Sequence, residues 1–444
     1  MSETDHELPP ATIALLPWGN VIEDFLDTLG ISLESFCNEF TGSWMFAYVD
    51  ALGRVGVRTV LICISASVVQ PSRFTHRPTG CTIYMLPVPK VYRFLRRKIP
   101  GPYGRTVKQM FGEIRGSRRL LFPALAILKE VRLYLTTPLR SLARVLHDEG
   151  CQAILCQEYE YPRFDLCVLL GRLMHLPVFA TFQGGDYHHS RVERLLRPLA
   201  MRASAGLIVA PQSEVQRLQA LYIVSPGKVA RIFTPIDVQF WSVTHCSEAR
   251  AELGIRLDAQ VVLWHGRISL WQKGLDILLD AWKQVCSERP GRNLRLLLVG
   301  AGQDSEKLRQ RLTAMQQRNV LWVDKFIHDR ATIRRYLSAG DIYVLPSRHE
   351  GFPLAPLEAM ACGLPIVAAD AQGIPDILAG GETSGGLIVP RNDAPALALA
   401  LGRLLDDEAW RLELGRRAGH RIEASFSPEA VGMQLRTFLT NGRN

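Results

Sequence analysis

The sequence predicts an α/β fold built from two successive doubly wound domains. Short apolar runs, of the kind that form buried parallel strands, alternate with helical segments along the whole chain. Several of these runs end in Gly, Pro or Ser, and open α/β sheets carry their ligand loops at that end of each strand. Because 444 residues exceed what one hydrophobic core ordinarily spans, we expect two units of roughly 200 residues each.

The predicted strands fall into two groups. Before residue 240 they are the runs 11–18, 58–65, 153–157, 176–182 and 206–211, and after it the runs 260–266, 294–300, 319–324, 341–347, 365–370 and 386–390. Helical patterns separate the later strands at 274–288, 304–317, 330–339 and 393–405. Strand patterning lapses over 236–250, so we place the domains at 1–240 and 241–426. We expect a C-terminal helix, 427–444, to rejoin the first domain.

Composition restricts the class of protein. A hydrophobic fraction of 47% with 21% charged residues is typical of a globular protein, and no run approaches the ~20 apolar residues that cross a bilayer. The acidic start "MSETDHELPP" lacks the apolar region of a signal peptide, so we expect a cytoplasmic protein. Nine scattered cysteines without a CxxC pair argue against a disulfide framework or zinc site and for reduced, mostly buried thiols.

Two cations follow the predicted strand 260–266. Arg267 and Lys273 lie in the loop ahead of the next helix, where two fixed positive charges suit a diphosphate leaving group. Solvated surface cations are the alternative interpretation. Gly300 and Gly302 open the following helix, and their missing side chains allow the backbone to approach a nucleotide closely, although a lone GxG is a weak signal.

The stretch "SRHEGFPLAPLEAMACGL", 347–364, places a helix start after a strand. Pro356 suits the first turn, and neither Leu354 nor Ala355 has a side-chain oxygen to cap it, which leaves their amides open to a phosphate. Glu358 falls in this first turn, where a carboxylate can accept bonds from a vicinal diol. Its alternative role is to complement the helix dipole.

The pattern of Glu350 and Glu358, separated by seven residues in "EGFPLAPLEAMACGLPIVAAD" and preceded by "GRISLWQKGLDILL", resembles that of the retaining family 4 glycosyltransferases, or glycosyl transferases group 1. The resemblance covers about 260–425. It implies a GT-B fold, with two Rossmann-like domains facing a central cleft, and a nucleotide diphosphate sugar as donor. By the same resemblance, Arg267 and Lys273 bind the diphosphate, Glu358 binds the ribose, and Glu350 contacts the transferred sugar.

The resemblance also implies donor contacts from loop amides between the two glutamates. Those of Gly351, Phe352, Leu354 and Ala355 suit this role, whereas Pro353 has no N–H to offer. Gly300 joins the predicted donor-binding residues.

The N-terminal half resembles the family more loosely. The nearest match to its glycine-rich turn is Gly42, Ser43 and Trp44, which we expect near the donor phosphate and the acceptor. Gln183, after the run 176–182, stands where the family often has a histidine facing the sugar. An amide can hydrogen-bond a sugar hydroxyl but cannot transfer a proton.

The implied reaction is transfer to an acceptor hydroxyl with retention at the anomeric carbon. The leaving phosphate oxygen helps to deprotonate that hydroxyl. The chain contains no D-x-D metal-chelating motif, so we expect no metal and no other cofactor. Another enzyme of similar fold, such as an epimerase or a hydrolase using the two glutamates as paired acids, remains an alternative. A non-catalytic nucleotide-sugar-binding protein is a further one.

Basic residues concentrate in residues 90–145, which carry 14 Lys and Arg against 2 Asp and Glu. Within 89–101, Val91, Phe94, Leu95 and Ile99 share one helical arc opposite Lys90, Arg93, Arg96 and Arg97. Such a helix can lie on an anionic membrane surface, or it can pack on the core with its basic face in solvent. Binding to nucleic acid is the least favoured of the three roles, because no nucleic-acid-binding motif accompanies the positive charge. We expect the acceptor to be a glycan or glycolipid of cell-surface biosynthesis.

Overall fold

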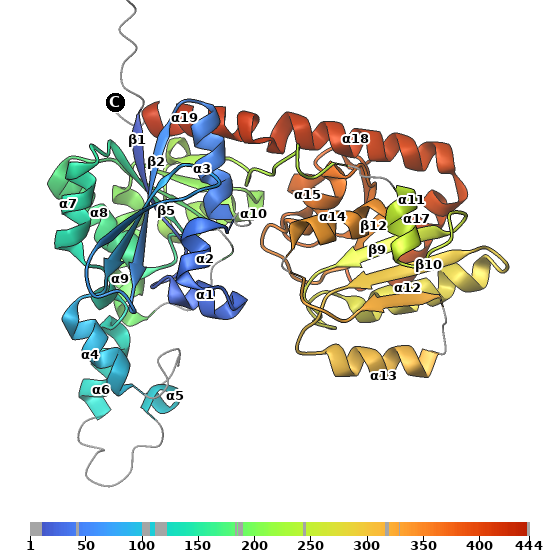
Figure 1. Cartoon of the computed structure of the whole chain (residues 1–444), viewed down its shortest axis with the longest axis horizontal. Coiled ribbons are helices and arrows are strands. Elements are labelled where there is room, and N and C mark those ends of the chain that lie inside the picture. The colour runs from blue at the N-terminus through green and yellow to red at the C-terminus, as the bar shows by residue number, and fades with distance from the viewer. Residues whose placement is uncertain are drawn as a thin grey trace, which may run out of the picture. The chain divides into compact units, whose positions relative to one another are not determined.

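The computed structural model describes residues 11–40, 44–99, 107–111, 122–182, 184, 190–242, 246–315, 319–327 and 329–441. The chain divides into two compact units (Figure 1). Unit 1 comprises residues 1–209, 214–232 and 432–444, and unit 2 comprises 210–213 and 233–431. The chain passes from unit 1 to unit 2 at Ile232–Phe233, shortly before the predicted join at 236–250. Each unit contains its own sheet with helices on both faces, which confirms the predicted α/β class.

Unit 1 is built on an eight-stranded sheet of order β3-β4-β2-β1-β5-β6-β7-β8. All neighbouring pairs are parallel except β3–β4, and in the central pair Ala14 of β1 lies opposite Val60 of β2. The strands are β1 (Thr12–Leu16), β2 (Arg58–Ser65), β3 (Ser72–Thr75), β4 (Thr82–Pro87), β5 (Ala153–Gln157), β6 (Val178–Thr181), β7 (Gly206–Val209) and β8 (Val229–Arg231).

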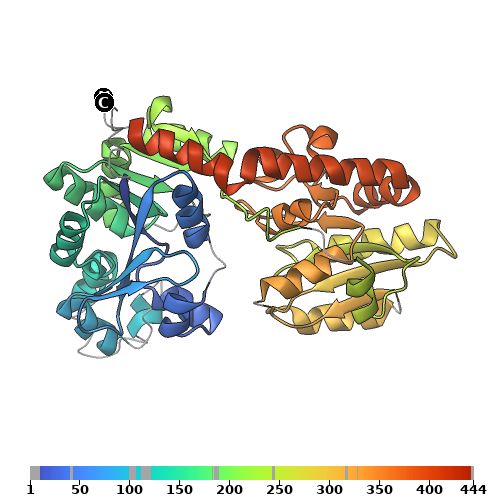
Figure 2. The ribbon, with the colours of Figure 1, turned by 45° about the horizontal axis from the view of Figure 1, so that its top comes forward.

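Helices cover both faces of this sheet (Figure 2). One face packs on α7 to α10 through a core that includes Leu146, Phe164, Met201 and Leu218. The helices are α1 (Glu23–Leu29), α2 (Leu33–Asn38), α3 (Trp44–Arg54), α4 (Lys90–Lys98), α5 (Val107–Phe111), α6 (Phe122–Val131), α7 (Leu139–Asp148), α8 (Pro162–Met174), α9 (Arg191–Ala203) and α10 (Gln212–Tyr222), with 3-10 turns η2 (Tyr134–Thr136) and η3 (Pro226–Lys228).

The C-terminal helix α19 (Pro428–Asn441) ends within unit 1. Its Phe438 ring packs edge-on against Phe179 of β6, with ring centroids 5.5 Å apart. A Cβ at Gly432 would lie 2.1 Å from the carbonyl oxygen of Ala51, so the glycine permits close packing of α19 on α3.

Unit 2 contains a six-stranded parallel sheet of order β11-β10-β9-β12-β13-β14. The strands are β9 (Gln260–His265), β10 (Leu294–Val299), β11 (Val320–Val323), β12 (Ile342–Leu345), β13 (Ile366–Ala369) and β14 (Gly386–Val389). This is the strand order of a Rossmann fold. Its direction of progression reverses between β9 and β12, and ligands of open α/β sheets bind outside the carboxyl ends of the strands at such a switch point.

Alternate residues of β9 point into different cores. Val261 and Leu263 pack with α14, α15 and α18, whereas Val262 and Trp264 pack with α12, α13 and α17. The helices of unit 2 are α11 (Cys246–Glu252), α12 (Leu275–Glu288), α13 (Ser305–Met315), α14 (Arg330–Ser338), α15 (Ala355–Ala361), α16 (Ile374–Ile377), α17 (Ala394–Asp406) and α18 (Glu408–Phe426), with the 3-10 turn η4 (Gly381–Ser384).

The eleven predicted strands are all present, and the four predicted helices of unit 2 correspond to α12, α13, α14 and α17. The strands β3, β4 and the short β8 are not among these eleven. All nine cysteines are free and seven are buried, as predicted. Among the described residues, no helix has both the length and the apolar character that a bilayer span requires.

The helix predicted within 89–101 is present as α4, but part of its apolar arc does not pack on the core, which contradicts the core-packed alternative. Two residues of the supposed apolar arc face solvent, Val91 at 60% and Phe94 at 62% exposure. Tyr92 is buried instead, and it packs with Val21, Ile64 and Val88. Periodicity showed two faces but could not show which one unit 1 covers.

Candidate functional site

A pocket of about 230 Å³ opens in unit 2 at the carboxyl ends of β9 and β10. This is one side of the switch point of the sheet. It is lined by Trp241, His265, Gly266, Arg267, Val299, Gly300, Lys325, Phe326, Ile327, Arg330, Ile333 and Glu358. Three predicted site residues, Arg267, Gly300 and Glu358, therefore meet in one pocket although they come from three separate loops and helices.

Glycine is required where the loops after β9 and β10 meet. A Cβ at Gly300 would lie 1.9 Å from the carbonyl oxygen of Gly266, and Gly300 has a φ of +141°. A Cβ at Gly302 would lie 2.2 Å from the carbonyl oxygen of Ile268. The Ile268 amide donates a hydrogen bond to the carbonyl oxygen of Ala301 over 3.0 Å. The packing of one loop on the other thus accounts for both glycines, and Gly300 also forms part of the pocket wall.

Glu358 is held by a histidine that sequence reasoning missed. The Nε2 atom of His265 donates to Oε2 of Glu358 over 3.0 Å, and the two side chains are 10% and 22% exposed. Among the described residues, Nδ1 of His265 is buried without a hydrogen-bond partner. The contact spans 93 residues of sequence, so the one local signal was a histidine at a strand end directly before Gly266.

Lys273 and Glu350 form an ion pair with each other. The ammonium Nζ of Lys273 donates to both oxygens of Glu350, at 2.8 and 2.9 Å, and the Glu350 side chain is only 7% exposed. Arg267 is separate from this pair and donates instead to Oε1 of Gln272 over 3.0 Å. The two predicted phosphate-binding cations therefore have different partners.

The loop between the two glutamates is fixed by packing. The Phe352 ring stacks on Phe233, with centroids 5.5 Å apart, and the backbone at Gly351 lies close to Gly373, where a Cβ would meet its carbonyl oxygen at 2.7 Å. Leu354 is the N-cap of α15 and provides no side-chain cap, as predicted, and Ala355 is the first helical residue.

The pocket contains cationic and apolar residues that the sequence analysis did not single out. Burial lowers the pKa of Arg330, although Asp237 and Glu358 act against this shift. Its guanidinium carbon lies 4.3 Å from the ring centroid of Phe240. Lys325 and the 57%-exposed Phe326 complete this side of the pocket. The arrangement combines positive charge with an apolar surface large enough for an aromatic base.

Several predicted residues lie outside the described part of the chain. These are Gly42, Ser43 and Gln183. Trp44 is the first residue of α3, and its side chain is likewise outside the description.

The fold and the pocket define a protein with two Rossmann-like units and a ligand site at the switch point of the second. Residues 259–407 match the family model described as "Glycosyl transferases group 1". The likeness to this family therefore lies in unit 2, where the matched segment runs from β9 to α17.

Three relatives illustrate the likeness. The D-inositol 3-phosphate glycosyltransferase of Corynebacterium glutamicum is 31% identical over 258 residues, 56% of this chain and 60% of the relative. A GDP-mannose-dependent monoacylated alpha-(1-6)-phosphatidylinositol monomannoside mannosyltransferase of the same species is 31% identical over 220 residues, 48% of this chain and 54% of the relative. The alignments thus span little more than half the length of these curated relatives. The structure of Anabaena Alr3699/HepE in complex with UDP has the same fold, with a TM-score of 0.64, 16% identity, and 97% and 100% of the two chains covered.

Proposed function

We propose that this protein is a retaining glycosyltransferase that moves a sugar from a nucleotide diphosphate sugar to an acceptor hydroxyl. The observation that carries the proposal is the convergence of Arg267, Gly300 and Glu358 on one pocket at the switch point of unit 2. The match of residues 259–407 to the glycosyl transferases group 1 model supports the same chemistry.

The pocket suits the nucleoside diphosphate part of such a donor. Phe326 and Ile333 provide an apolar surface for the base, and Glu358 accepts hydrogen bonds from the ribose diol. Arg267 binds the diphosphate, and Lys325 adds positive charge from the same pocket lining. These fixed cations can neutralise the leaving group, so we expect transfer to proceed without a divalent metal.

The reacting sugar belongs, in this proposal, beside Glu350. Because Lys273 is bound to both Glu350 oxygens, an incoming diphosphate competes with a carboxylate for the ammonium group. When Lys273 turns to the phosphate, Glu350 is released to accept a sugar hydroxyl. The bond from the anomeric carbon to the β-phosphate oxygen then breaks, the acceptor oxygen bonds on the same face, and its proton passes to the leaving phosphate.

The donor site is tested by calorimetry of the full chain with UDP, GDP and ADP, followed by the corresponding sugars. We expect one nucleoside diphosphate to bind. We further expect Arg267→Ala to weaken it by about tenfold or more, the size of a lost charge-assisted hydrogen bond. Arg335→Ala is the matched control, because Arg335 is half exposed, pairs with Glu252 and lies outside the pocket lining. Binding of none of these nucleotides, or equal effects of the two variants, would refute the assignment.

The reaction itself is tested on the same protein. Proton NMR of a fresh product should show the anomeric configuration of the donor sugar, and activity should persist in EDTA. Inversion of configuration would overturn the mechanism. Loss of activity in EDTA with recovery on adding magnesium would overturn the metal-independent form.

We propose that unit 1 binds the acceptor, a glycan or glycolipid of cell-surface biosynthesis, with Gly42, Ser43, Trp44 and Gln183 facing it. A cytoplasmic protein that associates peripherally with the inner membrane fits this role. The exposed side chains of α4 support that association, because Val91 and Phe94 face solvent together with Lys90 and Arg97. Apolar and basic groups on one helix face suit an anionic lipid surface.

A further inference from the structure

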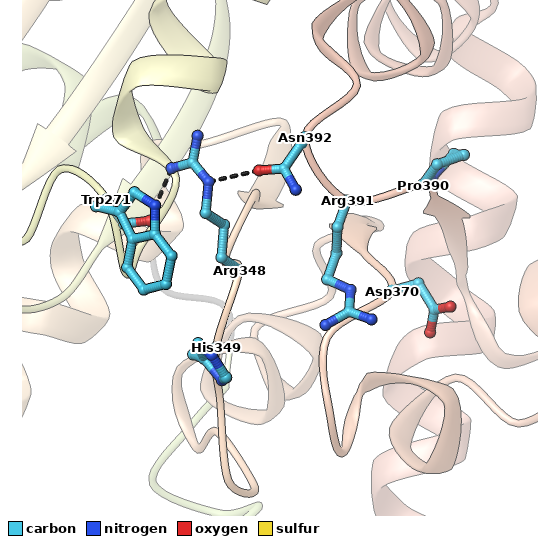
Figure 3. A pocket seen from close by; sticks show the side chains of 7 residues that line it. All are labelled: Trp271, Arg348, His349, Asp370, Pro390, Arg391 and Asn392. Atoms are coloured by element: carbon cyan, nitrogen blue, oxygen red, sulfur yellow. Dashed lines mark hydrogen bonds between the residues drawn. The ribbon is translucent and has the colours of Figure 1, made fainter.

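A second pocket, of about 480 Å³, lies in unit 2 at the carboxyl ends of β12, β13 and β14 (Figure 3). It shares no lining residue with the pocket assigned to the nucleotide. Its lining residues are Trp271, Arg348, His349, Asp370, Pro390, Arg391 and Asn392. The proposed transfer reaction gives none of these residues a role.

One wall of this pocket is held together by the hydrogen bonds of Arg348. Its Nη1 and Nη2 atoms donate to the two carboxylate oxygens of Asp276 at 2.7 and 2.8 Å. Nη1 also donates to the carbonyl oxygen of Trp271 at 2.7 Å, and Nε donates to Oδ1 of Asn392. Arg348 therefore ties the Trp271 loop to the turn after β14 with four of its five N–H donors.

The other polar groups of the pocket are uncommitted. Within the described residues, the side chains of Asp370 and Arg391 have no hydrogen bond or ion pair, and the His349 ring contacts only the indole of Trp271. In Figure 3, Asp370 and Arg391 stand on the side of the pocket away from Trp271 and His349. The Trp271 side chain is 61% exposed, which is unusual for so large an aromatic group.

Charge and shape together indicate the class of ligand. The positive charges of Arg348 and Arg391 are matched by Asp276 and Asp370, so the surroundings do not favour an anion. An exposed indole face attracts the C–H groups on one side of a sugar ring, and a free carboxylate and guanidinium can bind its vicinal hydroxyls. We propose that this pocket is a binding site for a neutral pyranose ring, stacked on Trp271 and hydrogen-bonded by Asp370 and Arg391.

The proposed site goes beyond the transfer reaction and does not depend on it. It is nonetheless connected to the Lys273–Glu350 pair, because the same two loops carry both. The amides of Arg348 and His349 bond to the carbonyl oxygen of Gln272 at 3.0 and 3.4 Å, which joins residues 271–273 to residues 348–350. A sugar bound against Trp271 and His349 therefore lies on the loops that position Lys273 and Glu350.

Saturation-transfer NMR on the full chain tests the site. The probes are the methyl α-pyranosides of glucose, mannose and galactose, each with excess UDP present. We expect magnetic saturation to pass from the protein to ring protons of at least one sugar, and we expect this signal to persist in the presence of UDP. Trp271→Ala should abolish it, whereas Trp271→Phe should keep a weaker signal because an aromatic face remains.

The polar contacts are tested by the affinity of the responding sugar. Asp370→Asn and Arg391→Met should each raise its dissociation constant by about tenfold, the effect of a lost hydrogen bond to a charged group. Arg403→Met is the control, since Arg403 is an exposed arginine of α17 outside the pocket, and it should change nothing.

Three results would overturn the proposal. They are absence of a saturation-transfer signal for all three sugars, an equal signal in Trp271→Ala, and loss of the signal on adding UDP. The last result would place the sugar in the first pocket. Binding of inorganic phosphate that depends on Arg391, without binding of any sugar, would make the pocket an anion site instead. Nucleotide calorimetry on the same variants reports separately on the donor site, so failure of one proposal is distinguishable from failure of the other.

Discussion

Glu358 and Glu350 each meet a basic side chain in unit 2, and the two partners differ in kind. Glu358 uses one oxygen to accept a hydrogen bond from His265, whereas Glu350 uses both oxygens on the Lys273 ammonium group. Glu358 therefore keeps an oxygen for a ligand hydroxyl, while Glu350 must first lose Lys273. We infer that two acids near a phosphate site are compatible with an anionic ligand because a basic side chain faces each of them.

The motif residues of the site could be recognised from sequence because their spacing is local. Glu350 and Glu358 are close in the chain, and Arg267 and Lys273 share one loop. His265 and Arg330 could not be recognised in this way, because each takes its place only when separate elements pack. The roles assigned to the predicted residues stay predictions until ligand binding is measured.

Gly300 provides a sharp test of the loop geometry. Gly300→Ala places a methyl group 1.9 Å from the Gly266 carbonyl oxygen at a φ of +141°. Gly254→Ala is the control, because Gly254 also has a positive φ, +64°, but a Cβ there meets nothing within 4 Å. We expect Gly300→Ala to lower the free energy of unfolding of unit 2 by about 1–3 kcal/mol more than the control, the usual cost of overpacking. Urea titration measures this, and equal losses would contradict the close contact.

At the scale of elements, buried charges join α8 and α9 in unit 1. Arg197 of α9 is fully buried, and its Nε donates to Oδ1 of Asp165 of α8 at 2.7 Å. Burial alone would lower the pKa of Arg197, but Asp165, Glu160 and Glu193 outweigh it and hold that pKa above its usual value. The pair thus fixes two helices on one face of the sheet.

Removing one partner of this pair should be costly. We expect Asp165→Ala to destabilise the protein by about 3–5 kcal/mol, because it leaves a buried guanidinium without its bidentate carboxylate. Asp148→Ala is the control, since Asp148 is 58% exposed and, within the described ranges, pairs with His147 alone. Replacing both partners, as Asp165→Leu with Arg197→Met, should recover most of the loss. If thermal unfolding shows Asp165→Ala to be no worse than Asp148→Ala, the pair has no such role.

The edge strand β3 escaped prediction for a physical reason. Three of the four residues of β3 are exposed, and the strand lies at the sheet edge, so it has no apolar run to reveal it. For α4, helical periodicity separated apolar from basic residues, but of the apolar arc only Ile99 is buried, together with Tyr92 from outside the arc. Most buried parallel strands were found because both of their faces must be apolar. The exception is β4, which is mostly buried and pairs in parallel with β2 but was missed.

For the molecule as a whole, charge is divided unevenly along the chain. Residues 1–245 carry 27 Lys and Arg against 20 Asp and Glu, whereas residues 246–444 carry 25 against 23. Most of unit 1 lies in the first of these segments, so it holds most of the basic excess. An excess of this kind attracts the protein to an anionic surface over about one Debye length and cannot by itself hold it there.

The exposed apolar residues of α4 are what we expect to convert this attraction into membrane binding. The full chain should co-sediment with vesicles rich in phosphatidylglycerol at low salt, and less so as salt rises. The double variant Val91→Ser with Phe94→Ser should weaken binding by about tenfold or more, because each side chain loses its burial in lipid. Leu399→Ser with Leu412→Ser is the matched control, since both leucines are about as exposed, at 66% and 64%, but lie on helices of unit 2. Equal binding to neutral vesicles, or an equal loss in the control, would show that α4 is not the element that contacts the membrane.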